Sequence, residues 1–222
     1  MVNIPLSKPC LGEEEKRAVE EVLDSGFLAQ GTNVKKFEEE FAHYIGVKEA
    51  IATSSGTTAL FVALKALGVK EGDQVVTTPF TFVATASSIL YCGGIPVFCD
   101  VDEKTFNLDP GKLEDILKKE KNIKGIIAVH LYGLPCDLEE ITFLAQKYNL
   151  FLVEDCAQAH GAECQGRKVG SWGDMGVFSF YPTKNMTTGE GGMVTTSDLL
   201  LAQKCRMLIN HGSRKRYYHE ML

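Results

Sequence analysis

The sequence lacks the features that would place the protein in a membrane, on a nucleic acid or around a metal. No apolar run approaches the roughly 20 residues that span a bilayer, and the N-terminal stretch "MVNIPLSKPCLGEEEKRAVE" has no signal-peptide pattern. The seven cysteines never form a CxxC pair, which predicts reduced thiols rather than a disulfide framework or a zinc site. The formal net charge of −6 argues against nucleic acid or anionic lipid as the main partner. We therefore expect a cytoplasmic protein with no membrane, nucleic-acid or metal partner.

Short apolar stretches alternate with amphipathic ones along most of the 222 residues. Short strands separated by helices of about ten residues predict βαβ crossovers and a mainly parallel sheet. The predicted strands are 49–55, 73–78, 95–101, 125–133, 150–155, 176–181 and 191–197. The predicted helices are 13–26, 33–46, 57–68, 82–93, 111–120, 137–149 and 199–210. The predicted fold class is therefore α/β, with about seven strands covered by helices.

The same pattern predicts the domain organisation and the ends of one helix. An N-terminal helical segment, residues 1–46, precedes an α/β core over residues 47–222. The helix 33–46 is predicted to have Asn33 as its N-cap and to end at Gly46. Because sheets of this kind bind ligands at the carboxyl ends of their strands, the residues that follow each strand are the first candidates for function.

The segment "SSGTTAL" (54–60) joins a predicted strand to a predicted helix. Gly56 permits close backbone approach, and Thr57 adds a hydroxyl beside the free N–H groups of the first helical turn. Together they predict a phosphate-sized anion site, with an ordinary helix N-cap as the competing interpretation. The segment is not a Walker A loop, since no lysine follows the glycine, and no GxGxxG dinucleotide fingerprint occurs.

Two further strand ends carry polar or aromatic residues. "LFLVEDCAQAHGA" places Asp155 at the end of an apolar strand, with Gln158 and His160 just beyond it. A helix cap competes there with a functional carboxylate. "TPFTFVAT" places Phe82 after another strand, where core packing competes with a ligand contact.

Lys184 lies in "SFYPTKNMTTGEGGMV", between an apolar strand and a glycine-rich turn. Apolar surroundings favour the neutral, nucleophilic form of a lysine amine, which can form a Schiff base. An anion site, an aromatic ring, a strand-end carboxylate and such a lysine are predicted at one edge of the sheet. These are the parts that pyridoxal 5'-phosphate (PLP) needs.

Five stretches, taken in order, resemble a known family. "SSGTTAL", "TPFTFVATA", "VEDCAQAHGA", "GVFSFYPTKNMTTGEGGMV" and "NHG" are similar to motifs of the DegT/DnrJ/EryC1/StrS sugar aminotransferases. These are PLP enzymes of the aspartate-aminotransferase fold (fold type I). The resemblance makes Lys184 the Schiff-base lysine and a catalytic residue. It also makes Asp155 a second catalytic residue, as the partner of the pyridinium nitrogen, and Gln158 a hydrogen-bond partner of the phenolic oxygen.

The resemblance also implies how the rest of the cofactor would be held. Phe82 would stack on one face of the pyridine ring, and Ala157 would contact the other face. The phosphate would be held by Gly56, Thr57 and Ser179.

The reaction implied is transfer of an amino group from a donor such as glutamate to a nucleotide-linked keto-sugar, in polysaccharide or glycan synthesis. Lys184 would be the general base. The family further implies a homodimer with the active site at the subunit interface. Gln30, Gly31 and His160 are candidates for lining the sugar pocket, with turn or packing roles as the alternative.

Several alternatives remain open on the sequence alone. A PLP-dependent sugar dehydratase of the same fold would have histidine in place of Lys184. The chain could instead be a regulatory binding protein. It could also be a truncated, non-catalytic fragment, since family members are longer and the small C-terminal domain of the fold is expected to be absent from these 222 residues.

Overall fold

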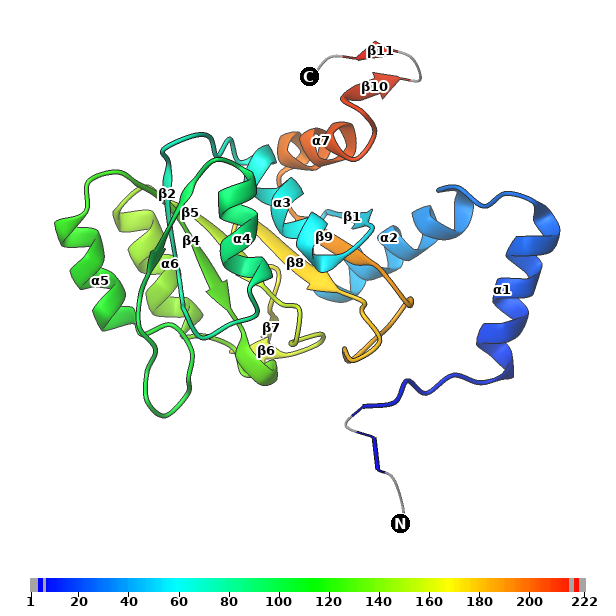
Figure 1. The fold of residues 1–222 in the computed structure, drawn as a ribbon, viewed down its shortest axis with the longest axis horizontal. Coiled ribbons are helices and arrows are strands. Elements are labelled where there is room, and N and C mark those ends of the chain that lie inside the picture. The colour runs from blue at the N-terminus through cyan, green and yellow to red at the C-terminus, as the bar shows by residue number, and fades with distance from the viewer. Residues whose placement is uncertain (1–3, 6, 216–217, 220–222) are drawn as a thin grey trace.

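The computed structural model describes residues 4–5, 7–215 and 218–219 and is organised around one seven-stranded sheet (Figure 1). The strands lie in the order β1 (Glu49–Thr53), β9 (Gly192–Thr196), β8 (Met175–Ser179), β5 (Phe151–Asp155), β4 (Ile123–Val129), β2 (Gln74–Thr77) and β3 (Ile95–Phe98). The strands from β8 to β3 pair in parallel, and β9 runs antiparallel to both β1 and β8. The predicted mainly parallel α/β sheet is confirmed.

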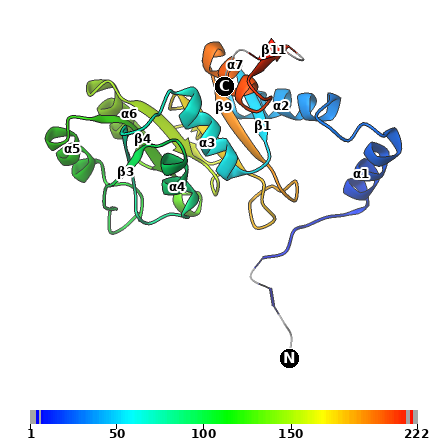
Figure 2. The same ribbon diagram turned by 45° about the horizontal axis from the view of Figure 1, so that its top comes forward.

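Helices cover both faces of this sheet, because successive side chains along each buried strand point to opposite faces. One face is covered by α3 (Gly56–Ala66), α4 (Ala84–Tyr91) and α7 (Leu199–Leu208), and the other by α2 (Thr32–Ile45), α5 (Pro110–Lys119) and α6 (Leu138–Lys147). Val153 packs toward the first set and its neighbour Leu152 toward the second. Figure 2 shows α3 and α4 together on one side of the strands. The core is therefore two apolar layers, one on each side of the sheet.

The first helix, α1 (Glu13–Ser25), has no buried residue and stands away from the sheet (Figures 1 and 2). Three glutamates occupy its first turn, where they suit the positive end of the helix dipole. It ends at Gly26, which has the left-handed φ of 69° that favours glycine at a helix C-terminus. Its apolar residues Val19 and Leu23 are exposed. This helix is therefore defined by the residues at its two ends and not by packing against the sheet.

The start of α2 differs from the sequence prediction. Gly31, not Asn33, is the N-cap, and its carbonyl accepts the Lys35 N–H at 3.1 Å. The predicted cap Asn33 is therefore wrong, because that residue already lies inside the first helical turn. The predicted end is confirmed at Gly46, whose φ is 85°.

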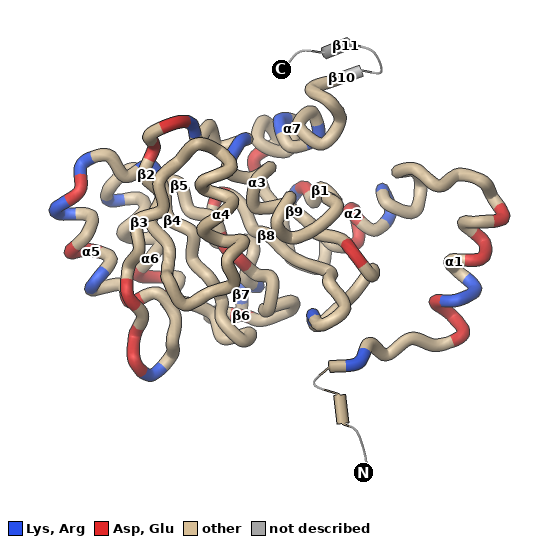
Figure 3. The backbone as a smooth tube through the Cα atoms, viewed as in Figure 1, with Lys and Arg blue, Asp and Glu red and all other residues tan. Residues whose placement is uncertain are grey.

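Several small elements were not predicted. They are the 3-10 turn η1 (Leu131–Gly133), the strand pair β6 (Glu163–Cys164) and β7 (Arg167–Lys168), and the strand pair β10 (Ser213–Lys215) and β11 (Tyr218–His219). Among the described residues, no helix has the length and apolar character needed to cross a membrane. Figure 3 shows charged residues along α1 and α5, whereas α4 carries none.

Candidate active site

A cavity of about 470 Å³ opens at the carboxyl ends of the parallel strands. Its walls come from the segments that follow β1, β2, β4, β5 and β8, so residues far apart in the sequence meet there. The structure brings all eight residues predicted to bind the cofactor to this one cavity: Gly56, Thr57, Phe82, Asp155, Ala157, Gln158, Ser179 and Lys184.

The start of α3 forms one end of the cavity. The hydroxyl of Ser55 accepts the Thr58 N–H at 3.1 Å, and the Thr58 hydroxyl accepts the Ser55 N–H at 2.9 Å. These two residues are thus a helix cap, as the competing interpretation held. Within the described part of the chain, the N–H groups of Gly56 and Thr57 have no protein acceptor. They are therefore free to bind an anion at the positive end of the helix.

Gly56 lies unusually close to the end of β8. A Cβ atom at this position would lie 2.7 Å from the Cβ atom of Ser179, nearer than real Cβ contacts allow. Glycine is therefore required for the Ser179 hydroxyl to lie beside the free N–H groups of α3. The result is a cradle that combines backbone and hydroxyl donors.

Asp155 ends β5 and is only 5% exposed. Its carboxylate accepts the Thr85 hydroxyl at 2.9 Å and the Ala157 N–H at 3.2 Å. Burial raises the pKa of Asp155, and these two hydrogen bonds, with the nearby His130 and Lys184, oppose that rise. A buried carboxylate facing a cavity suits a cationic ring nitrogen.

Lys184 lies in the loop between β8 and β9 and is half-buried. Its Nζ has no hydrogen-bond or ion-pair partner among the residues that the structure describes. Gln158 uses its Oε1 to accept the Tyr132 N–H at 2.8 Å, which leaves its amide N–H groups to donate. Phe82 is 71% exposed at the wall of the cavity. The cavity thus holds a free amine, a side-chain donor and an accessible aromatic ring.

Sequence reasoning missed several residues that line the cavity. Thr81 and Thr85 lie on the segment that follows β2, Tyr181 follows β8, and His130 follows β4. The threonines stand four residues apart in the stretch from which only Phe82 was chosen. Thr81 lies just before the predicted helix 82–93 and Thr85 lies in its first turn, so the available signal was two hydroxyls beside Phe82 after a strand end.

Gln30 and Gly31 do not reach this cavity in the described chain. They line a second cavity of about 500 Å³, which also involves Glu38 of α2 and Arg206 of α7. His160 lies behind the Lys184 loop, with ring centroids 5.4 Å from Phe178 and 5.6 Å from Phe180, and its Nδ1 is 3.4 Å from Asn185 Oδ1. The suggested sugar-pocket residues are therefore not brought together by this chain.

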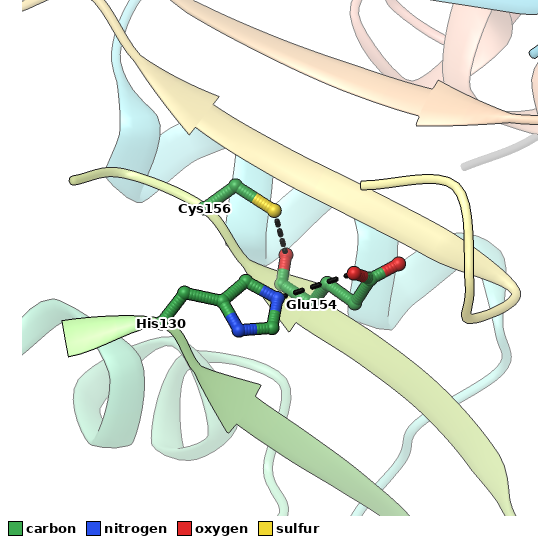
Figure 4. A group of neighbouring side chains, drawn as sticks. All are labelled: His130, Glu154 and Cys156. Carbon is green, nitrogen blue, oxygen red and sulfur yellow. Dashed lines mark hydrogen bonds and ion pairs between the residues drawn. The ribbon is translucent and has the colours of Figure 1, made fainter. Parts of the chain in front are cut away.

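A buried group of His130, Glu154 and Cys156 has the residue types of a metal site (Figure 4). His130 Nδ1 accepts the Cys136 N–H at 3.0 Å, so its ring proton lies on Nε2, 3.1 Å from the Glu154 carboxylate. That carboxylate also accepts the backbone N–H groups of Gly170, Trp172 and Gly173 at 2.7 to 2.9 Å. Burial raises the pKa of Cys156 to about 12, which keeps it a thiol. The group is therefore a hydrogen-bond network that ties β4, β5 and the 170–173 turn together.

The family model described as the DegT/DnrJ/EryC1/StrS aminotransferase family matches residues 9–222. The chain belongs to this family. Its members are PLP-dependent sugar aminotransferases of fold type I, which confirms the resemblance of the five motifs.

Relatives within the family share both sequence and fold with the chain. The spore coat polysaccharide biosynthesis protein SpsC of Bacillus subtilis is 48% identical over 96% of this chain and 54% of its own length. The GDP-perosamine synthase of Vibrio cholerae is 39% identical over 99% of this chain and 60% of its own length. The solved structure of an aminotransferase from Psychrobacter cryohalolentis has a TM-score of 0.92 at 44% identity, covering 98% of this chain and 58% of that chain. The chain thus spans little more than half of these DegT/DnrJ/EryC1/StrS relatives.

The cavity fits the cofactor of the DegT/DnrJ/EryC1/StrS family on chemical grounds. It has unpaired N–H donors at one end, a buried carboxylate, an exposed ring and an unpaired lysine amine. A phosphate, a ring nitrogen, a ring face and an aldehyde would each find a matching group.

Proposed function

We propose that this chain is the PLP-binding part of an enzyme that transfers an amino group from an amino acid, such as glutamate, to a nucleotide-linked keto-sugar. One observation carries the proposal. The unpaired Nζ of Lys184, the carboxylate of Asp155 and the free N–H groups at the start of α3 all face one cavity of about 470 Å³. These three groups lie at or just after the ends of three different strands, β8, β5 and β1.

Each group of the cavity has a proposed task toward PLP. Gly56, Thr57 and Ser179 would hold the phosphate, and Asp155 would hold a protonated ring nitrogen. The bound cofactor supplies an electron sink next to the carbon from which a proton is lost. The ring contacts would come from Phe82 and Ala157, and a hydrogen bond from the amide of Gln158.

Lys184 has two tasks in this proposal. Its amine would hold PLP by condensing with the aldehyde of the cofactor, with loss of water. With the amino-acid donor bound in its place, Nζ would act as the general base that takes a proton from the α-carbon of the donor and returns one, a contribution of about 10²- to 10⁴-fold in rate. No carboxylate pairs with Nζ in the described residues, which leaves the amine available for both tasks.

The family and the relatives' own names support the substrate class that we propose. One relative is a GDP-perosamine synthase and another a spore coat polysaccharide biosynthesis protein. A nucleotide-linked keto-sugar destined for a polysaccharide or glycan is therefore the acceptor that we propose. The cavity described above is the place where its carbonyl carbon would meet the amine.

We propose a homodimer as the working unit, with the cavity at the interface. Phe82 and its neighbour Val83 are 71% and 67% exposed beside the cavity, and a second copy would cover them. Sedimentation equilibrium measures the mass directly. A monomer at all protein concentrations would contradict the proposed dimer, and the proposal that the chain binds PLP would still stand.

The dehydratase alternative differs in one residue of the cavity. It would require histidine where the chain has Lys184. The presence of a lysine with an unpaired amine in the cavity favours amino transfer.

The cofactor proposal is tested by covalent trapping. Purified chain is mixed with PLP, reduced with borohydride and digested, and the peptide that carries PLP is identified by mass. We expect the label on Lys184, its loss in Lys184→Ala, and its retention in Lys168→Ala, where the lysine pairs with Glu163 at 2.8 Å instead. No label in a folded sample, or a label that survives in Lys184→Ala, would contradict the proposal.

A further inference from the structure

Asp155 is linked through hydroxyl groups to the segment that follows β2. Thr85 Oγ1 lies 2.9 Å from Asp155 Oδ2, and Thr81 Oγ1 lies 2.9 Å from Thr85 Oγ1. Thr85 is 1% exposed, while Thr81 lies on the cavity wall four residues earlier. The three side chains form a line from the cavity wall to the end of β5.

The direction of this line follows from the chemistry of its members. An ionised carboxylate only accepts hydrogen bonds, so Thr85 must donate its proton to Asp155. The Thr85 oxygen is then the acceptor for the Thr81 hydroxyl. Each bond polarises the next, which strengthens the contact to the charged end.

Another buried hydroxyl of α4, that of Ser88, bonds to its own helix and not to a neighbouring strand. Ser88 is also buried, and its hydroxyl donates to the carbonyl of Ala84 at 2.7 Å, four residues earlier in the same helix. Thr85 instead reaches across to a different strand. Its hydroxyl therefore serves Asp155 rather than the helix.

We propose that Thr81 and Thr85 are positioning residues that keep Asp155 ionised and fix its carboxylate toward the cavity. This inference rests on the proposed function, since an ionised Asp155 is what a protonated ring nitrogen requires. Neither threonine was predicted from the sequence. Thr85 also anchors the segment of Phe82 to the strand of Asp155, so the ring contact and the nitrogen contact are joined.

Other groups also act on Asp155. Burial raises the pKa of Asp155, and the donors that oppose it are the Thr85 hydroxyl and the Ala157 N–H. The titratable groups that interact with it are His130 at the end of β4, Lys184 in the loop after β8 and the adjacent thiol of Cys156. Replacing only the hydroxyl separates the contribution of Thr85 from these groups, because the isosteric Thr85→Val leaves them in place.

The first measurement uses the chain without PLP. The side-chain carboxyl carbon of Asp155, assigned with Asp155→Asn, is followed by ¹³C NMR against pH in the wild type and in Thr85→Val, Thr85→Ser and Thr81→Val. We expect a higher titration midpoint in Thr85→Val, a smaller rise in Thr81→Val and the wild-type midpoint in Thr85→Ser. Thr142→Val is the matched control, because its buried hydroxyl on α6 has no partner among the described residues. An unchanged midpoint in both Val variants would overturn the proposal.

The second measurement is the dissociation constant of PLP in the same variants. Loss of a hydrogen bond to a charged group predicts binding weaker by about tenfold or more in Thr85→Val, with Thr85→Ser near the wild type. Equal affinity in Thr85→Val and wild type would overturn the positioning role. A wild type that binds no PLP would instead count against the proposed function, and the carboxyl titration would then decide the inference alone. The Thr81→Val variant keeps the hydrogen bond between Thr85 and Asp155. It therefore provides the test if Thr85→Val does not fold.

Discussion

Glu154 and Asp155 are adjacent carboxylates on β5 with different surroundings. Because neighbouring side chains of a strand point to opposite faces, Glu154 faces the 170–173 turn and Asp155 faces the cavity. From the sequence, Asp155 could be selected by its place at the strand end. The role of Glu154 could not be predicted, because its backbone donors lie 16 to 19 residues further along the chain and His130 lies 24 residues before it.

The contacts of Glu154 predict a large effect on stability. Glu154→Ala leaves three backbone N–H groups and His130 Nε2 without their acceptor in a fully buried place. We expect the free energy of unfolding to fall by about 3–5 kcal/mol, measured by urea denaturation. Glu163→Ala, on the exposed β6, is the control and should have little effect. A loss as small as that of the control would show that the turn finds other acceptors.

His160 predicts a dependence of stability on pH. Burial lowers its pKa, so the unfolded chain takes up a proton below about pH 6.5 where the folded chain does not. Stability is therefore retained above that pH and lost as the pH falls toward the lowered folded value. His160→Phe keeps a ring beside Phe178 and Phe180.

Urea denaturation at pH 7.5 and 5.5 checks this expectation. The loss of stability between the two pH values should be smaller in His160→Phe than in the wild type. His43 is exposed on α2, and His43→Phe should keep the wild-type loss. Equal losses in His160→Phe and wild type would show that His160 is protonated alike in both states.

At the scale of elements, the sequence predicted where strands and helices end, but it did not predict which side chains of different elements touch. The strands of the sheet and the large helices were found because apolar periodicity is local, and most ends agree within a few residues. β6 and β7, two residues each, carry no such periodicity. The predicted cap Asn33 was wrong because glycine is also common at this position, and Gly31 begins the helix with no side-chain cap hydrogen bond. The rule about parallel sheets predicted that strand-end residues such as Asp155 meet at one edge, and the family resemblance supplied others, such as Ala157. Thr85 instead needed the observed approach of α4 to β5.

The approach of α3 to β8 gives a prediction about Gly56. In Gly56→Ala the new methyl carbon would meet Ser179 Cβ at 2.7 Å, so the helix start and the strand end must separate. We expect a loss of about 1–3 kcal/mol in the free energy of unfolding, together with weaker PLP binding, because the two halves of the phosphate cradle move apart. Gly12→Ala is the control, since its new methyl group has nothing closer than 3.4 Å. Wild-type PLP affinity in Gly56→Ala would show that the cradle does not hold the phosphate.

At the scale of the molecule, the chain spans 54% of the length of SpsC and 60% of that of the synthase. Its sheet nevertheless has apolar layers on both faces, and the cavity is lined by described residues of this chain. Under the proposed function, cofactor binding would depend on groups that line this cavity. The suggested sugar-pocket residues Gln30 and Gly31 line a different cavity.

The position of α1 predicts that this helix adds nothing to the stability of the sheet. No residue of α1 is buried, and an isolated helix of its 13 residues is only marginally stable in water. A chain that begins at residue 27 should therefore unfold within about 0.5 kcal/mol of the full chain, while losing helical signal in circular dichroism. Urea denaturation at two protein concentrations makes the comparison. A larger loss than this in the free energy of unfolding would contradict the expectation. If that larger loss grows with protein concentration, the exposed Val19 and Leu23 pack against a second copy. If it is the same at both protein concentrations, α1 packs on its own sheet.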